Sequence, residues 1–169
     1  MKKQVIYRGR LLNLALRRVR LPNGFAIDLE VIEHPGAALV VPFLDKNRVI
    51  LIRQLRPVIK TYIYEAPAGT LKRGEDTLAC ARREIIEETG FSAQRFKMLG
   101  YIYPVPGYST EKIVIYKAGC LKRRAGSQRE KDEVIRNCTF TRSQVRRLFK
   151  KNKITDAKTI CALSMCCWL

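Results

Sequence analysis

The strongest constraint on the fold is an alternation of apolar and polar residues in the N-terminal part of the chain. Residues 12–17 alternate, the turn Pro22-Asn23-Gly24 follows, and residues 25–32 alternate again. Alternation with a period of two is typical of strands that bury one face. The pattern therefore predicts an antiparallel β-hairpin over residues 12–32.

Two more apolar runs follow this hairpin. They cover residues 37–43 and 49–52 and are separated by the turn Asp45-Lys46-Asn47. Continuous apolar runs of this length are typical of strands buried on both faces, and the short turn between them predicts a second hairpin. Later segments predict further strands at residues 97–103, 113–116 and 134–140.

Helical periodicity appears in three places. Between Asp76 and Thr89 the apolar residues share one stripe, with Asp76 at the position of an N-cap and Gly90 at the position of a C-terminal stop. A second helix is predicted to begin at Thr141, whose capping box is completed by Gln144, and a third runs from about Thr155 to the end. Strands interspersed with a few helices predict one unit of the α/β or α+β class.

Composition excludes several classes of protein. The chain has 169 residues, of which 47% are hydrophobic, enough for one domain with a core. Its single histidine, His34, precedes Pro35 and Gly36 and is expected in a turn, so a zinc site with two histidines is excluded. The six cysteines include no CxxC pair. No apolar run approaches the roughly 20 residues that span a bilayer, so we expect a cytoplasmic protein without a membrane span.

Acidic residues are scarce and concentrated. The chain holds 33 Lys and Arg against 15 Asp and Glu, a net charge of +18, yet six acids fall between residues 65 and 91. Glu84, Glu87 and Glu88 share one face of the predicted helix, where like charges repel each other. A hard divalent ion such as Mg²⁺ removes that repulsion and prefers oxygen ligands. A solvated acidic stripe neutralised by nearby arginines is the alternative interpretation.

The sequence around this helix matches a known motif. Gly69, five residues, Glu75, seven residues and then residues 83–91 fit the Nudix box, GX5EX7REUXEEXGU with U apolar, at every fixed position. The chain therefore resembles the Nudix hydrolases, which cleave nucleoside diphosphates linked to another moiety with Mg²⁺ or a similar ion such as Mn²⁺. The resemblance implies an α/β fold, a Nudix-type α/β/α sandwich of mixed sheet and helices over residues 37–169, preceded by an antiparallel β-sheet extension over residues 1–36.

The resemblance also implies roles for residues of the box. Glu84, Glu88 and the backbone carbonyl of Ala68 are expected to ligate the metal, Glu87 to assist, and Arg83 to orient these carboxylates. Gly69 is expected to allow a tight turn ahead of the helix, Gly90 to end the helix, and Glu75 to have a structural role.

Three segments outside the box resemble the ADP-ribose pyrophosphatase branch of the family. They are residues 53–57, 64–69 and 103–112, and Pro106 lies sixteen residues after Gly90, as is typical of that branch. The ending, residues 153–159, also resembles that branch. The implied reaction is hydrolysis of ADP-ribose to AMP and ribose 5-phosphate. Arg56 is the expected phosphate contact because its planar guanidinium suits bidentate binding, with Arg53 as the second choice unless it only ends a strand in solvent. Glu65, Pro106 and Glu111 are the other expected substrate-binding residues.

The carboxylate that activates water is expected outside the box. In the family it commonly follows the later strands, and residues 130–133 form the only acidic cluster in the C-terminal third. We expect Glu133 to be the base, with Glu130 as the alternate and a solvated loop as the other interpretation. The resemblance further implies a homodimer formed through residues 1–36.

The sequence also allows two other functions. GDP-mannose or another nucleoside diphosphate sugar is an alternative substrate, since those hydrolases resemble the same branch. A protein that binds or processes RNA is an alternative of another class, because the high charge includes a basic tract over residues 142–153. That tract lacks interleaved aromatic residues for stacking bases, so a solvated basic face is favoured.

Overall fold

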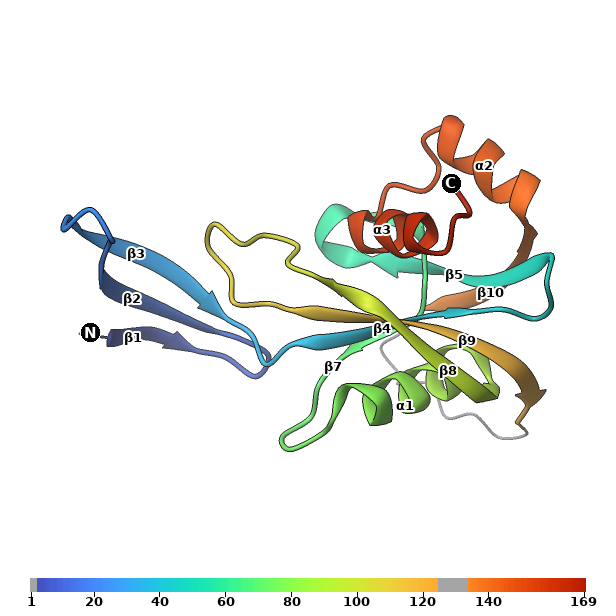
Figure 1. Cartoon of the computed structure of the whole chain (residues 1–169), viewed down its shortest axis with the longest axis horizontal. Coiled ribbons are helices and arrows are strands. Elements are labelled where there is room, and N and C mark those ends of the chain that lie inside the picture. The colour runs from blue at the N-terminus through green and yellow to red at the C-terminus, as the bar shows by residue number, and fades with distance from the viewer. Residues whose placement is uncertain (1–2, 125–133) are drawn as a thin grey trace.

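The chain folds as a mixed α/β structure with three sheets. The computed structural model describes residues 3–124 and 134–169. The first sheet is antiparallel and has the order β1-β2-β3, formed by β1 (Lys3–Arg8), β2 (Asn13–Arg20) and β3 (Ala26–Glu33). Strands β2 and β3 pair around the turn at Gly24, whose φ of 89° suits glycine, so the first hairpin is confirmed. This sheet projects from the body as the expected N-terminal extension (Figure 1).

The second sheet is the centre of the body and has the order β7-β4-β9-β8. Its strands are β7 (Ala68–Thr70), β4 (Ala37–Pro42), β9 (Ile113–Arg123) and β8 (Phe91–Ile102). Strand β4 is parallel to β9 and antiparallel to β7. Helix α1 (Thr77–Thr89) lies on one side of this sheet, and α3 (Ala157–Met165) lies on the other (Figure 1).

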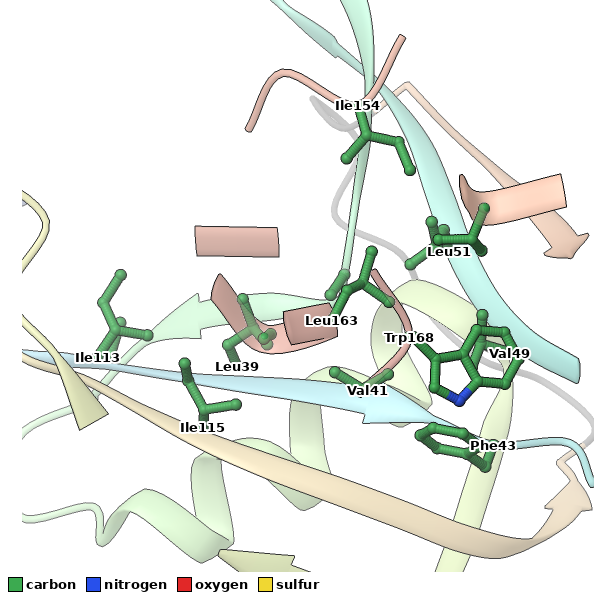
Figure 2. Close-up of a cluster of buried hydrophobic side chains, with 14 residues drawn as sticks. Leu39, Val41, Phe43, Val49, Leu51, Ile113, Ile115, Ile154, Leu163 and Trp168 are labelled. Atoms are coloured by element: carbon green, nitrogen blue, oxygen red, sulfur yellow. The ribbon is translucent and has the colours of Figure 1, made fainter. Parts of the chain in front are cut away.

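Strand β4 is apolar throughout because both of its faces are covered. Ala38 and Val40 pack in a cluster with residues of α1, while Leu39 and Val41 pack toward α3. The cluster on the α3 side also contains Trp168 (Figure 2). Burial of two faces fixes β4, and with it the neighbouring strand β7, firmly in place.

The third sheet has the order β10-β5-β6. It is formed by β10 (Ile135–Thr141), β5 (Arg48–Arg56) and β6 (Thr61–Glu65), with the short 3-10 helix η1 (Pro57–Ile59) between β5 and β6. Helix α2 (Arg142–Lys150) follows β10 directly, and its capping box between Thr141 and Gln144 is confirmed. Among the described residues, no helix has the length and apolar character needed to cross a membrane.

The predicted second hairpin is wrong. Strands β4 and β5 meet only at an isolated bridge between Phe43 and Val49 and then enter different sheets. A strand has two edges, and both edges of β4 are taken by β7 and β9. Strand β5 pairs instead with β6 and β10. The short turn at residues 45–47 therefore links two sheets rather than two strands of one hairpin.

Candidate active site

Helix α1 holds the acidic face in a fixed orientation. The Asp76 carboxylate accepts hydrogen bonds from the backbone N–H groups of Leu78 and Ala79, at 2.8 and 3.0 Å. Gly90 ends the helix in the left-handed conformation with φ of 74°. Both caps are as predicted. The apolar stripe of the helix packs on the central sheet, and its flanking residues Glu84 and Glu88 are only 8% and 3% exposed.

Arg83 joins three carboxylates of the box. Its guanidinium donates to both oxygens of Glu75, at 2.9 and 3.0 Å, to Glu87 at 2.9 Å and to Glu84. The hydrogen bonds from Arg83 lower the pKa of Glu75 to about 2, and the same carboxylates raise the pKa of Arg83. The predicted pairing of Arg83 with Glu87 is therefore present, and Glu75 anchors the far side of the guanidinium.

Strand β7 brings its backbone against these carboxylates. The N–H of Ala68 donates to Glu88 at 3.1 Å, and a Cβ added to Gly69 would overlap the Glu84 carboxylate. Gly69 lies within β7 and pairs with Ala38 of β4. Glycine is thus required here for close approach of a side chain, not for the tight turn expected from the sequence.

The donors gathered at this point suit a hard divalent cation. Glu84 and Glu88 converge on the Ala68–Gly69 backbone, so two carboxylates lie beside the peptide whose carbonyl was the predicted third ligand. Among residues 3–124 and 134–169, no three His, Cys, Asp or Glu side chains form a metal-binding group. A site of two carboxylates and one carbonyl leaves further positions for water and substrate phosphates, as Mg²⁺ commonly requires.

A cavity of about 350 Å³ lies beside this backbone. Of the predicted residues, Arg56, Ala68, Gly69 and Glu111 line it. It is also lined by residues that the sequence did not single out for binding, among them Leu11, His34, Pro104, Asp156 and Lys158. The cavity therefore joins the Ala68–Gly69 backbone to two cationic side chains.

Arg56 and Lys158 are held by the buried carboxylate of Glu65. Arg56 donates to its two oxygens at 2.6 and 2.7 Å, and Lys158 donates to Glu65 and, at 2.8 Å, to Asp156. Burial raises the pKa of Glu65, but the hydrogen bonds from Arg56 and Lys158 outweigh it, so the net pKa is lowered. The Glu65 side chain is 1% exposed and is absent from the cavity lining, so it orients the cations from behind.

Comparison with known proteins decides the family. A model of the NUDIX domain matches residues 33–163. The chain belongs to the Nudix family. It is 32% identical to the methanol dehydrogenase activator of Bacillus methanolicus, over 96% of this chain and 88% of that protein. It is also 32% identical to the ADP-ribose pyrophosphatase of Bacillus subtilis (strain 168), over 95% of this chain and 88% of that protein.

A solved structure confirms the Nudix fold. The crystal structure of an ADP compounds hydrolase superposes with a TM-score of 0.83 and 23% sequence identity, covering 98% of this chain and 89% of that one. The α/β fold expected from the box is therefore correct. The chain is a Nudix pyrophosphohydrolase, and enzymes of this family generally need a divalent metal ion.

Some predicted residues of this Nudix site lie away from the cavity. The Arg53 guanidinium lies over the Tyr62 ring, 4.5 Å from its centroid, and Pro106 is exposed in the loop between β8 and β9. Neither lines the cavity, although Pro104 of the same loop does. Glu130 and Glu133 lie outside the described residues.

A larger cavity of about 1010 Å³ lies elsewhere, between β8, β9 and Trp168. Of the described residues that line it, Asp45 alone is acidic, and the Ala68–Gly69 backbone is absent from its lining. The smaller cavity is lined by the Ala68–Gly69 backbone that Glu84 and Glu88 contact, and on this ground we assign the candidate active site to it.

Lys158 and Asp156 were missed because their roles depend on a contact across the fold. Asp156 caps α3, where it accepts from the Thr159 N–H at 3.0 Å, and Lys158 reaches Glu65 from 93 residues away. The short segment Thr155-Asp156-Ala157-Lys158 carries a capping signal, and that signal alone says nothing about the strand that the helix end approaches.

Proposed function

We propose that this Nudix enzyme hydrolyses the diphosphate bond of ADP-ribose, or of a related nucleoside diphosphate sugar, to give AMP and ribose 5-phosphate. The observation that carries the proposal is the convergence of Glu84 and Glu88 on the Ala68–Gly69 backbone, at the wall of a cavity that also holds Arg56 and Lys158. Similarity to the Bacillus subtilis ADP-ribose pyrophosphatase supports this substrate.

The residues of the site have separate roles in metal binding, positioning and phosphate binding. Glu84, Glu88 and the Ala68 carbonyl hold Mg²⁺, or Mn²⁺, which when bound neutralises charge on the diphosphate. Arg83 keeps Glu84 and Glu87 in place, and Glu75 keeps Arg83 in place. Arg56 and Lys158 line the cavity that receives the diphosphate, and their positive charges attract its phosphate groups.

Water must lose a proton as its oxygen bonds to phosphorus and the bond from phosphorus to the bridging oxygen breaks. We assign the removal of that proton to Glu133, with Glu130 as the alternate, on sequence grounds alone. A general base contributes about a hundredfold or more to rate. Glu133→Gln is therefore expected to lower kcat about a hundredfold at saturating Mg²⁺, while Glu130→Gln keeps most of the activity. The opposite result would assign the base to Glu130.

A panel of substrates tests the function itself. ADP-ribose, ADP-glucose, GDP-mannose, NADH and diadenosine polyphosphates are incubated with Mg²⁺ or Mn²⁺, and the products are identified by chromatography. We expect AMP and ribose 5-phosphate from ADP-ribose as the fastest reaction. Faster release of GMP from GDP-mannose would favour the alternative nucleoside diphosphate sugar, and no turnover of any of them would refute the proposal.

We also propose that residues 1–36 form a homodimer interface. The extension exposes a set of large apolar side chains, namely Ile6, Tyr7, Leu11, Phe25 and Ile27. Exposed apolar groups of this size are typical of surfaces that meet a partner. Light scattering at micromolar concentration is expected to give twice the chain mass of 19.4 kDa, and a monomer would contradict the interface.

Nucleic acid as the partner is less well supported. In the basic tract, Arg142 donates to the Cys167 carbonyl and Arg146 to the Leu169 carbonyl at 3.4 Å, so two of its cations bind the C-terminal end of the chain. RNA binding that persists at physiological salt, without turnover of ADP-ribose, would favour that rival.

The cytoplasmic location stays a prediction from the sequence, which cell fractionation can check.

A further inference from the structure

His34 is the single histidine of the chain and lies where the extension joins the Nudix domain. Its Nδ1 accepts a hydrogen bond from the backbone N–H of Gly36 at 3.1 Å. An accepting nitrogen carries no proton, so the neutral ring carries its proton on Nε2. The backbone makes no turn or bend at residues 34–36, which link β3 to β4, but this local turn closed by the side chain fixes the ring as a donor through Nε2.

The ring is almost enclosed, yet it faces the active-site cavity. The His34 side chain is 9% exposed, and His34 lines the cavity together with Arg56, Ala68 and Lys158. Within residues 3–124 and 134–169, no hydrogen bond engages Nε2 of this ring. Nε2 is not among the buried polar atoms that lack a partner, so this donor is accessible from the cavity, where a ligand can accept its hydrogen bond.

The backbone of His34 is held by the loop between β8 and β9. Its N–H donates to the Thr110 hydroxyl at 3.0 Å, and that hydroxyl donates back to the His34 carbonyl at 3.3 Å. The Thr110 N–H donates to the Ile32 carbonyl at 3.0 Å. Contacts on both sides of His34 give the ring a defined position, as specific recognition requires.

Strand register orients His34 relative to the Ala68–Gly69 backbone. Ala68 pairs with Leu39, whereas Ala37 pairs with Thr70, so β4 runs back from the metal-binding peptide toward His34. At about 3.3 Å per residue, Ala37 is already about 7 Å from Leu39 along the strand, and His34 precedes Ala37 by three residues. His34 therefore precedes the end of β4 that pairs with Thr70, and it lines the cavity on the side of Ala37 away from the Leu39–Ala68 pair.

The chemistry at that end suits a sugar. Glu111 also lines the cavity, with its Oε1 3.8 Å from Nδ1 of the His34 ring, so the cavity offers a carboxylate acceptor as well as the Nε2 donor. A hydroxyl group both donates and accepts, whereas a base is usually held by stacking on an aromatic side chain. Among the described residues that line this cavity, none is Phe, Tyr or Trp.

We propose that His34 is a specificity-determining residue whose Nε2–H donates a hydrogen bond to a hydroxyl of the sugar that the diphosphate carries. This inference depends on the proposed function, because it assumes that a nucleoside diphosphate sugar occupies the cavity. It assigns to His34 a contact that ADP-ribose can make and that ADP, which lacks the second sugar, cannot make.

The variant His34→Asn tests the hydrogen bond donated by Nε2 separately from the one that Nδ1 accepts. The asparagine Oδ1 can accept the Gly36 N–H in the same i to i+2 turn, but asparagine has no group at the position of Nε2. Dissociation constants for ADP-ribose and ADP are measured by calorimetry in EDTA, where hydrolysis does not interfere. We expect the variant to bind ADP-ribose about fivefold more weakly, the effect of one lost hydrogen bond, and ADP as tightly as the wild type does.

Two results would overturn the assignment. Wild-type affinity of His34→Asn for both ligands would leave His34 as a turn residue only, and an equal loss for both would exclude a contact with the sugar. His34→Ala, which also removes the turn acceptor, serves as the comparison, and its thermal midpoint is expected to be lower than that of His34→Asn. A wild-type chain that hydrolyses no nucleoside diphosphate sugar would refute the proposed function, while the ratio of the two affinities would still decide the role of His34.

Discussion

Glu88→Gln is expected to lower kcat for ADP-ribose about a thousandfold at saturating Mg²⁺, the equivalent of about 4 kcal/mol of transition-state stabilisation. Glutamine keeps the shape of the side chain and can still accept the Ala68 N–H through its amide oxygen. It removes the negative charge that a hard cation needs. The loss is therefore expected in catalysis, with the fold retained.

Metal titration separates this effect from misfolding. The Mn²⁺ affinity of Glu88→Gln, followed by electron paramagnetic resonance, should fall at least tenfold, and its circular dichroism spectrum should match that of the wild type. Asp45→Asn is the matched control, since it makes the same change of charge in an exposed turn where the side chain accepts the Asn47 N–H at 2.8 Å. An unaffected rate in Glu88→Gln would refute the mechanism.

Local signals in the sequence were sufficient to predict the position of the helix that carries the carboxylates of the Nudix box. Asp76, Gly90 and the apolar stripe between them act over a few residues, so capping and periodicity predicted both ends of α1. The pairing of Arg83 with Glu87 also follows from helix geometry, because the two residues are four positions apart. These features could be predicted because each depends on contacts within one element or its ends.

Features that depend on contacts between distant segments could not be predicted. The second hairpin failed because β7 and β9 compete with β5 for the edges of β4, and local sequence does not report that competition. The attachment of Lys158 to Glu65 joins α3 to β6. Gly69 is a further example. The Nudix box requires glycine at this position, but the physical reason, the close contact with the Glu84 carboxylate, depends on the folded structure.

Because Gly69 lies against the Glu84 carboxylate, Gly69→Ala is expected to lower activity strongly, although glycine carries no functional side chain. The pairing of β7 with β4 fixes the backbone at position 69, so the added methyl group must displace the Glu84 carboxylate from Arg83 and from the Ala68–Gly69 peptide. We expect kcat to fall about a hundredfold, with the thermal midpoint changed by only a few degrees. Gly119→Ala is the matched control, because it lies in strand β9 and its added Cβ would meet nothing within 4 Å. If Gly69→Ala kept the wild-type kcat, Glu84 would not act from the position it occupies here.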